Sequence, residues 1–106
     1  MATDWAADIK KYAPDADDAI VAKILKTYRL VLSNRDSAYV ATSDASEVAT
    51  VREKFLKKKL GLTEDDATLD AAIADVAARM KGDRTKSRAT VYYLLAEKFG
   101  KLDVFA

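Results

Sequence analysis

The chain has 106 residues, of which 18 are Lys or Arg and 17 are Asp or Glu, and it contains no histidine and no cysteine. Missing cysteine excludes disulfides, thiolate nucleophiles and zinc ribbons, and missing histidine excludes an imidazole base or a histidine metal ligand. The length and the twenty alanines predict an all-α fold, a compact single-domain bundle of four to five helices over residues 1–106.

Two helices are predicted before residue 33. Apolar residues at helical spacing from Trp5 to Tyr12 indicate a short first helix, for which Thr3 is the candidate N-cap. Pro14 ends this helix, and the aspartates within residues 15–18 open the second one. Because the apolar face of the second helix runs from Ile20 to Leu32 without a break in period, a single helix is expected there.

A third helix is predicted after residues 33–41, a segment whose conformation the sequence does not decide in full. Residues 33–36 have the composition of a turn, whereas residues 37–41 fit either one helical turn or an extended segment. Asp44 followed by Glu47 has capping-box spacing and opens the third helix, which ends at Gly61. No segment alternates apolar and polar residues over a strand length, so no β-sheet is expected.

Two further helices complete the predicted bundle. The fourth lies between Thr63, whose spacing from Asp66 is a variant of the capping box, and Gly82. It carries the most regular apolar stripe of the chain: Leu69, Ile73, Val76 and Met80. The fifth begins at residue 84 or 86 and ends near Phe99, with these side chains inward: Val91, Leu94, Leu95 and Phe99.

The charge pattern bears on location. Residues 1–20 carry five aspartates against two lysines and no long apolar stretch, so no secretory leader is predicted. The longest uncharged apolar run, residues 91–96, is too short to span a bilayer. The sequence therefore predicts a cytoplasmic protein with no membrane association.

The densest basic run, residues 52–59, lies before Gly61 and is expected to be a solvated end of the third helix.

The expected start of the fifth helix contains four candidate anion-binding residues: Arg84, Lys86, Ser87 and Arg88. Free amides at a helix start bind anions, and the two arginines would add charge. Cations at that position oppose the helix dipole, so helix stability does not explain them. Two interpretations stay open, an anion site and a structural network in which Asp83 caps the helix and the arginines pair with the acidic fourth helix. In either case Arg88 is expected to lie over Tyr92, four residues later.

The same region offers a nucleic-acid alternative. Residues 75–77 and 87–91 resemble the helix-turn-helix of lac-repressor-type regulators. The two segments lie farther apart than the turn of about three or four residues in that motif, and residues 92–95 have the composition of a core. Nucleic-acid binding would then depend on this basic segment alone, because the net charge is only +1.

No catalytic motif, cofactor or metal is predicted, since the chain lacks the usual nucleophile and phosphate-loop patterns. The expected function is a non-catalytic binding or interaction module, with an anion- or nucleic-acid-binding protein as the alternative. Self-association is one form of the binding-module hypothesis. Its candidate apolar surface comprises Trp5, the alanine-rich fourth helix, and the C-terminal Leu102, Val104 and Phe105.

Four segments carry a family resemblance: residues 34–38, 51–62, 80–88 and 90–96. Through them the chain resembles, over nearly its whole length, a family of small bacterial proteins, the domain-of-unknown-function family numbered twenty-eight fifty-three. The resemblance implies a small, helical, single-domain bacterial protein. It supplies no catalytic residue, so it supports the fold and adds no activity.

Overall fold

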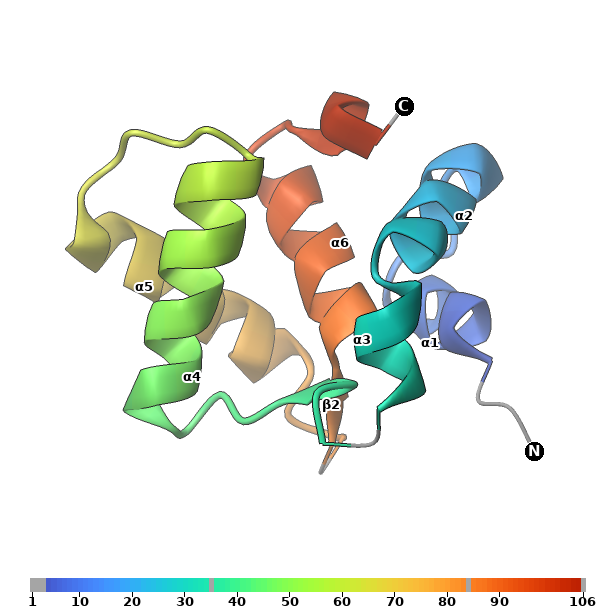
Figure 1. Ribbon diagram of the computed structural model, residues 1–106, viewed down its shortest axis with the longest axis horizontal. Helices are drawn as coiled ribbons and strands as arrows, with labels where there is room; N and C mark the ends of the chain where they lie inside the picture. Colours follow the sequence, from blue (N-terminus) through green and yellow to red (C-terminus); the bar gives the residue numbers. More distant parts are fainter. Residues whose placement is uncertain (1–3, 35, 84, 106) are drawn as a thin grey trace.

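A computed structural model of the chain describes residues 4–34, 36–83 and 85–105. The described part contains six α-helices, one π-helix, one 3₁₀-helix and two short strands (Figure 1). In chain order the elements are α1 (Trp5–Tyr12), α2 (Asp18–Thr27), α3 (Arg29–Ser33), β1 (Tyr39–Val40), α4 (Ala45–Thr50), the π-helix η1 (Val51–Lys59), α5 (Asp66–Arg79), β2 (Lys86–Ser87), α6 (Arg88–Lys98) and the 3₁₀-helix η2 (Leu102–Phe105).

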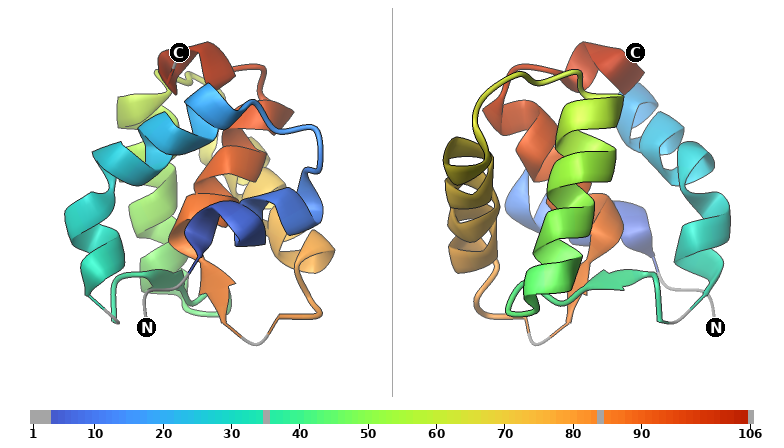
Figure 2. Two further views of the ribbon diagram at one scale, coloured as in Figure 1. Left: turned by 90° about the vertical axis from the view of Figure 1, so that its right-hand side faces the viewer. Right: turned by 60° about the vertical axis from the view of Figure 1, so that its left-hand side comes forward.

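The last α-helix, α6, is the centre of the fold. Every residue from Arg88 to Ala96 is buried, so this helix meets protein around its whole circumference. Figures 1 and 2 show α6 enclosed by α1 and α2 on one side and by η1 and α5 on the other. The predicted inward residues Val91, Leu94 and Leu95 are buried, whereas Phe99 is half-buried.

The predicted third helix exists, but most of it is a π-helix. α4 continues without a break into η1, where the Leu60 amide donates to the Phe55 carbonyl at 2.9 Å, a bond across five residues. Such bonds give a wider turn than in an α-helix. The buried side chains follow that wider turn, with spacings of four, one and four residues: Val51, Phe55, Leu56 and Leu60. Gly61, at φ +68°, ends the helix as predicted.

The predicted single helix over Ile20–Leu32 is instead two helices that meet at Tyr28. The Thr27 hydroxyl donates back to the Lys23 carbonyl at 2.7 Å, a bond that bends helices. Tyr28 itself leaves the helical conformation, with φ −105° and ψ 19°. Its ring centroid lies 5.0 Å from that of Tyr92, so the bend occurs where this ring meets α6.

The expectation that the chain has no β-sheet is wrong in one place. β1 and β2 pair antiparallel, with Tyr39 opposite Ser87 and Val40 opposite Lys86. Strands of two residues are too short for alternation to be detected in a sequence. Within the undecided segment 37–41, the pair makes Tyr39 and Val40 extended beside the start of α6, whereas Ser37 lies in a turn that the Ala38 amide closes by donating to the Asn34 carbonyl at 2.9 Å. The fold is therefore mostly helical with one small sheet.

Asp44 caps α4 as predicted, whereas the caps of α5 and α1 are aspartates that were not predicted. Asp65, not Thr63, caps α5, although the predicted stripe from Leu69 to Met80 is buried in full. Asp4 caps α1, and the predicted cap Thr3 lies outside the described residues. In both cases an aspartate one or two residues after the expected one accepts a hydrogen bond from a free amide of the first turn. Within the described ranges, no helix is long and apolar enough to cross a membrane.

Asp83 joins the loop before α6 to the first helix. Its carboxylate accepts hydrogen bonds from the Lys11 ammonium, at 2.8 Å, and from the Tyr12 hydroxyl. These two bonds hold the pKa of the Asp83 carboxyl below its usual range. Asp83 therefore fastens α1 to the loop, and it does not cap the last helix as one sequence interpretation required.

This contact predicts a pH effect on stability. Because the folded-state pKa of Asp83 is lowered, the contact stabilises the fold fully above the ordinary carboxyl pKa of 3.8. The stabilisation is lost as the pH falls from that value through the lower folded-state pKa. In acid titrations of unfolding free energy, Asp83→Asn should flatten this part of the curve. An exposed control, Asp36→Asn, should leave it unchanged, and identical curves for wild type and Asp83→Asn would contradict the contact.

Candidate functional site

Of the four predicted anion-binding residues, three lie in the described part of the chain, and Arg84 lies outside it. Lys86 is half-buried, and its ammonium donates to the Asp83 carbonyl at 3.0 Å. Ser87 is buried, and its hydroxyl accepts from the Thr90 amide as the N-cap of α6. Both side chains therefore hold the start of α6 in place.

Arg88 is the most enclosed charge of this group, with 7% of its surface exposed. Its guanidinium donates to the Ser37 carbonyl at 2.6 Å and to the Tyr92 hydroxyl at 3.0 Å. It also forms an ion pair with the Glu47 carboxylate at 3.3 Å. The centre of the guanidinium lies 5.7 Å from the centroid of the Tyr92 ring, which confirms the expected placement of Arg88 over Tyr92.

The acidic partner of Arg88 is not the one expected. Sequence reasoning placed it on the acidic fourth helix and assigned Glu47 to a capping box, but Glu47 of α4 forms the pair. These contacts favour the structural interpretation of Arg88, since its donors already have acceptors within the fold. Anion binding by Arg84, Lys86, Ser87 and Arg88 stays a prediction. α6, which would be the DNA-reading helix, is buried from Arg88 to Ala96.

The cap gives a direct prediction for Ser87. Ser87→Ala should lower the free energy of unfolding by about 1 kcal/mol, because one amide of the first turn of α6 loses its acceptor. Urea denaturation of the two proteins would measure the difference. Ser87→Thr, which keeps a hydroxyl, should retain more of the stability than alanine, and equal losses for both variants would contradict the capping role.

Four aromatic rings from four separate elements form one cluster: Tyr28, Phe55, Tyr92 and Phe105. Phe55 and Tyr92 are stacked with centroids 3.8 Å apart and an interplanar angle of 6°. Tyr28 meets both of them edge-on. Phe105, predicted as part of an exposed apolar surface, is only 1% exposed, because η2 folds it into this cluster.

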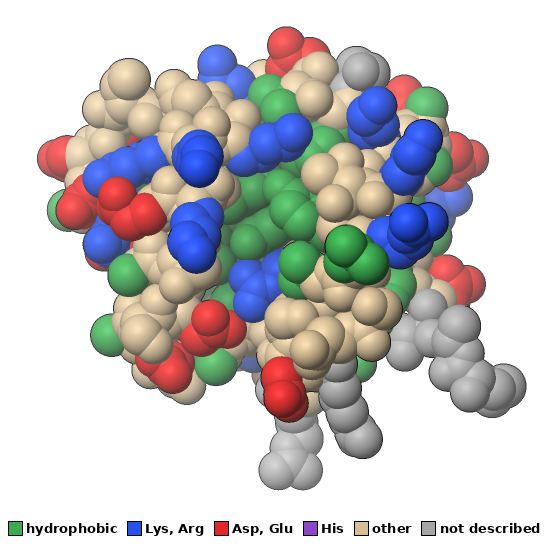
Figure 3. Space-filling view, in the orientation of Figure 1, with side chains coloured by type: hydrophobic (Ala, Val, Ile, Leu, Met, Phe, Trp, Pro, Cys, Tyr) green, Lys and Arg blue, Asp and Glu red, His purple; other side chains and the backbone are tan. Residues whose placement is uncertain are grey.

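A hollow lies over this cluster. Figure 3 shows it between α4–η1 and α2–α3, with hydrophobic side chains visible inside and Lys or Arg side chains along its edges. We call it the aromatic groove: its borders are α2–α3 and η1, and the four-ring cluster, which joins Tyr28 of one border to Phe55 of the other, lies buried between them. The Lys59 ammonium lies 5.4 Å from the Phe105 centroid and so marks one edge. Tyr28 is the half-exposed ring of the four.

The borders of the aromatic groove carry uncompensated positive charge. Six Lys and Arg residues on these elements are exposed and have no ion-pair partner among the residues that the structure describes: Lys23, Lys26, Arg29, Lys54, Lys58 and Lys59. Lys57, by contrast, pairs with Glu53 and Asp66. We call these six residues the groove cations. Sequence reasoning took the lysines of 52–59 as a solvated helix end and did not connect them with α2, which is remote in the sequence.

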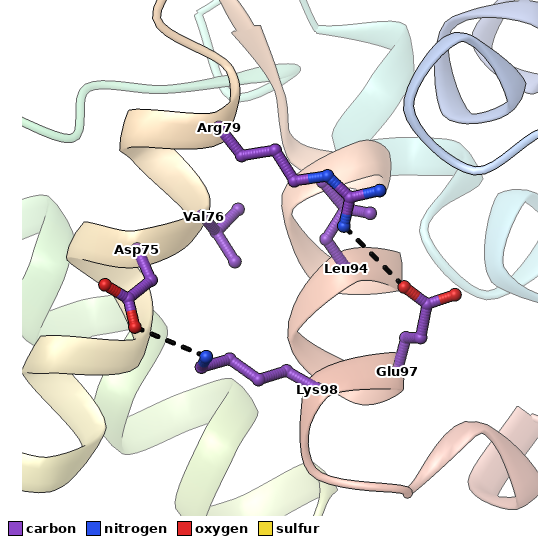
Figure 4. A pocket seen from close by; sticks show the side chains of 6 residues that line it. All are labelled: Asp75, Val76, Arg79, Leu94, Glu97 and Lys98. Atoms are coloured by element: carbon purple, nitrogen blue, oxygen red, sulfur yellow. Dashed lines mark ion pairs between the residues drawn. The ribbon is translucent and has the colours of Figure 1, made fainter.

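A second depression lies between α5 and α6 (Figure 4). It has a volume of about 230 Å³ and is lined by Asp75, Val76, Arg79, Leu94, Glu97 and Lys98. Two ion pairs link its walls, Lys98 with Asp75 at 3.3 Å and Arg79 with Glu97 at 3.7 Å. Its charges therefore have partners within the fold, in contrast to the groove cations, and the aromatic groove is the stronger candidate site.

The predicted surface for self-association is only partly exposed. Trp5 is half-buried against Tyr39, with ring centroids 5.6 Å apart, and Phe105 is in the core. The outer face of α5 remains an exposed row of small side chains: Ala67, Ala71, Ala74 and Ala78. Self-association stays a prediction, which sedimentation over a concentration series would test.

The chain matches the model of one protein family. The match extends over residues 4–103, and the family is described as "Protein of unknown function (DUF2853)". No curated protein matches the chain. The matched range contains all six α-helices and three of the four rings of the aromatic groove, Phe105 being the exception. Since this match covers nearly the whole chain, the protein belongs to the DUF2853 family.

Proposed function

We propose that the protein is a non-catalytic binding module that docks a segment of a partner protein in the aromatic groove. The observation that carries this proposal is the combination of a hollow with hydrophobic walls and six exposed cations without ion-pair partners in the described part of the chain. A groove between helices, with apolar floor and polar edges, is a common receptor for an amphipathic helix.

The chemistry of the groove supports binding more than catalysis. The rings between its borders are phenyl and phenol groups, and burial raises the pKa of Tyr28 well above its usual range. The Tyr28 hydroxyl therefore remains protonated at neutral pH and does not act as a base. The groove cations are exposed to water, a setting that suits pairing with the charges of a partner more than reaction in a water-excluded site.

A display library of helical peptides, unbiased in charge, would test the proposal. Peptides recovered on the immobilised protein would be titrated into isotope-labelled protein, with backbone amide shifts followed by NMR. We expect the largest shifts in residues 23–31 and 54–59, which border the groove, and small shifts on α5. Recovery of no binder, or shifts centred on α5, would contradict the proposed site.

A further inference from the structure

We infer that the segment docked in the aromatic groove is an acidic amphipathic helix, with carboxylates along its edges and bulky apolar side chains on one face. This inference rests on the proposed function and names the chemistry of the partner. It follows from the positive charge on the borders of the groove, from the burial of the aromatic rings between them and from the Tyr28 hydroxyl.

The first step is the imbalance of charge. Residues 21–33, which hold most of α2 and all of α3, contain three cations and no acidic residue. On η1 the one carboxylate, Glu53, already pairs with Arg52 and Lys57. The described acidic residues of α5 also have partners, since Asp66 and Asp70 pair with Arg52 and Asp75 pairs with Lys98. The groove cations are therefore available to a ligand, and complementary carboxylates would both steer and orient it.

The second step distinguishes two possible ligands, the apolar side chains of a docked helix and the stacked bases of a single-stranded nucleic acid. Single-stranded nucleic acids bind proteins by stacking bases on exposed ring faces. Phe55 is 1% exposed and Tyr92 is 5% exposed, and their faces are stacked on each other. The ring that remains at the groove is the half-buried Tyr28. It offers contact to an aliphatic or aromatic side chain of a helix and no platform for a run of bases.

The third step concerns the Tyr28 hydroxyl. Tyr28 is half-buried with its ring packed on three others, and its hydroxyl makes no hydrogen bond to another described residue. A polar donor within an apolar groove typically fixes the orientation of a ligand. Here it can donate to a carboxylate or carbonyl oxygen of the docked helix.

One groove cation is already held in place. The Lys59 ammonium lies over the Phe105 ring, 5.4 Å from its centroid. A side chain restrained in this way loses less conformational freedom when it binds a carboxylate. Lys59 is thus placed to pair with an acidic residue at one edge of the groove, while the exposed lysines of α2 can pair along the opposite edge.

Three matched peptides would test the inference by fluorescence anisotropy. They share one helical apolar face of Leu and Phe, and their edges carry only Glu, only Gln or only Lys. We expect the Glu peptide to bind at least about tenfold more tightly than the Gln peptide and the Lys peptide not to bind, because complementary charge selects the partner. The affinity of the Glu peptide should fall as salt is raised. A fourth peptide, with Glu edges and the apolar face replaced by Gln, should bind no more tightly than the Gln-edged peptide.

Two protein variants with the same change in charge provide the control. Lys26→Glu with Lys58→Glu reverses one cation on each border and should lose affinity for the Glu peptide by about tenfold or more while gaining affinity for the Lys peptide. Lys10→Glu with Lys81→Glu, outside the groove, should leave both affinities within about twofold. All four positions are exposed, so both variants are expected to fold, which circular dichroism would check.

The outcomes are distinguishable. Equal binding of the Glu, Gln and Lys peptides to the groove would overturn the acidic partner and leave the binding module standing. Binding of none of them, with no peptide recovered from the unbiased library, would overturn both. If heparin, an oligothymidylate or anionic vesicles bound as tightly as the Glu peptide, and lost affinity equally in the Lys26→Glu, Lys58→Glu variant, the groove would be a general polyanion site and the inference would be wrong.

Discussion

Phe55→Ala should lower the free energy of unfolding by about 3–5 kcal/mol. Phe55 is 1% exposed and contributes the central ring of the four-ring cluster, stacked on Tyr92 at 3.8 Å. Truncation would remove its apolar contacts and leave a cavity among rings that come from separate elements. Urea denaturation at neutral pH, followed by far-ultraviolet circular dichroism, would measure the loss.

Two controls separate this cavity from a general effect of truncation. Phe55→Leu fills much of the same space and should cost about 1–2 kcal/mol. Leu30→Ala removes a side chain that is 79% exposed and should change stability by less than about 0.5 kcal/mol. A Phe55→Ala loss as small as that of Leu30→Ala would mean that the ring stack is not formed in solution.

Arg88→Met should cost about 3 kcal/mol, because it removes one partner of a buried network and keeps most of the side-chain volume. The Glu47 carboxylate would lose its ion pair, and the Tyr92 hydroxyl and the Ser37 carbonyl would each lose a donor. Arg88→Lys should also be destabilising, since one ammonium cannot reach three acceptors in the geometry of a guanidinium. Arg29→Met, at an exposed position of α3, is the matched control and should be close to neutral.

A double-mutant cycle would show whether Glu47 carries part of this effect. In a Glu47→Gln background, Arg88→Met no longer leaves a charge without its partner, so its cost should be smaller than in the wild type. If the losses in unfolding free energy of the two single variants simply add in the double variant, Arg88 and Glu47 are not energetically coupled. The hydrogen bonds of Arg88 to Ser37 and Tyr92 would then account for the effect. The same measurements bear on the predicted anion site, since a free anion-binding arginine would cost little stability when removed.

The parts of the fold that depend on local pattern were predictable. The stripe of α5 from Leu69 to Met80 repeats with the period of an α-helix, and all four side chains are buried as expected. The bend at Tyr28 was not predictable, because the apolar stripe continues through it and the contacts found there, the Thr27 hydroxyl bond and the packing of the Tyr28 ring on Tyr92, leave no periodic pattern. The π-helix was missed for a related reason. Phe55 and Leu56 are adjacent and both buried, a pattern that fits a wider turn than the one assumed.

The candidate site depends on contacts between distant parts of the chain. The rings of the aromatic groove are spread from residue 28 to residue 105, and no local period relates them. The partner of Arg88 was assigned to the wrong helix because Glu47, 41 residues away, had a sufficient local role in a capping box. Charge counts were more informative. The unbalanced cations of residues 21–33 are visible in the sequence and could have drawn attention to α2.

The position of α6 in the chain has a consequence for biosynthesis. Proteins are made from the N-terminus, and the helix that all the others surround is the last α-helix to leave the ribosome. Until residues 88–98 emerge, the apolar faces of α1, α2, η1 and α5 have no common surface to cover. The nascent chain would then expose Phe55 and the α5 stripe to solvent and to chaperones until residues 88–98 emerge and the core closes around them.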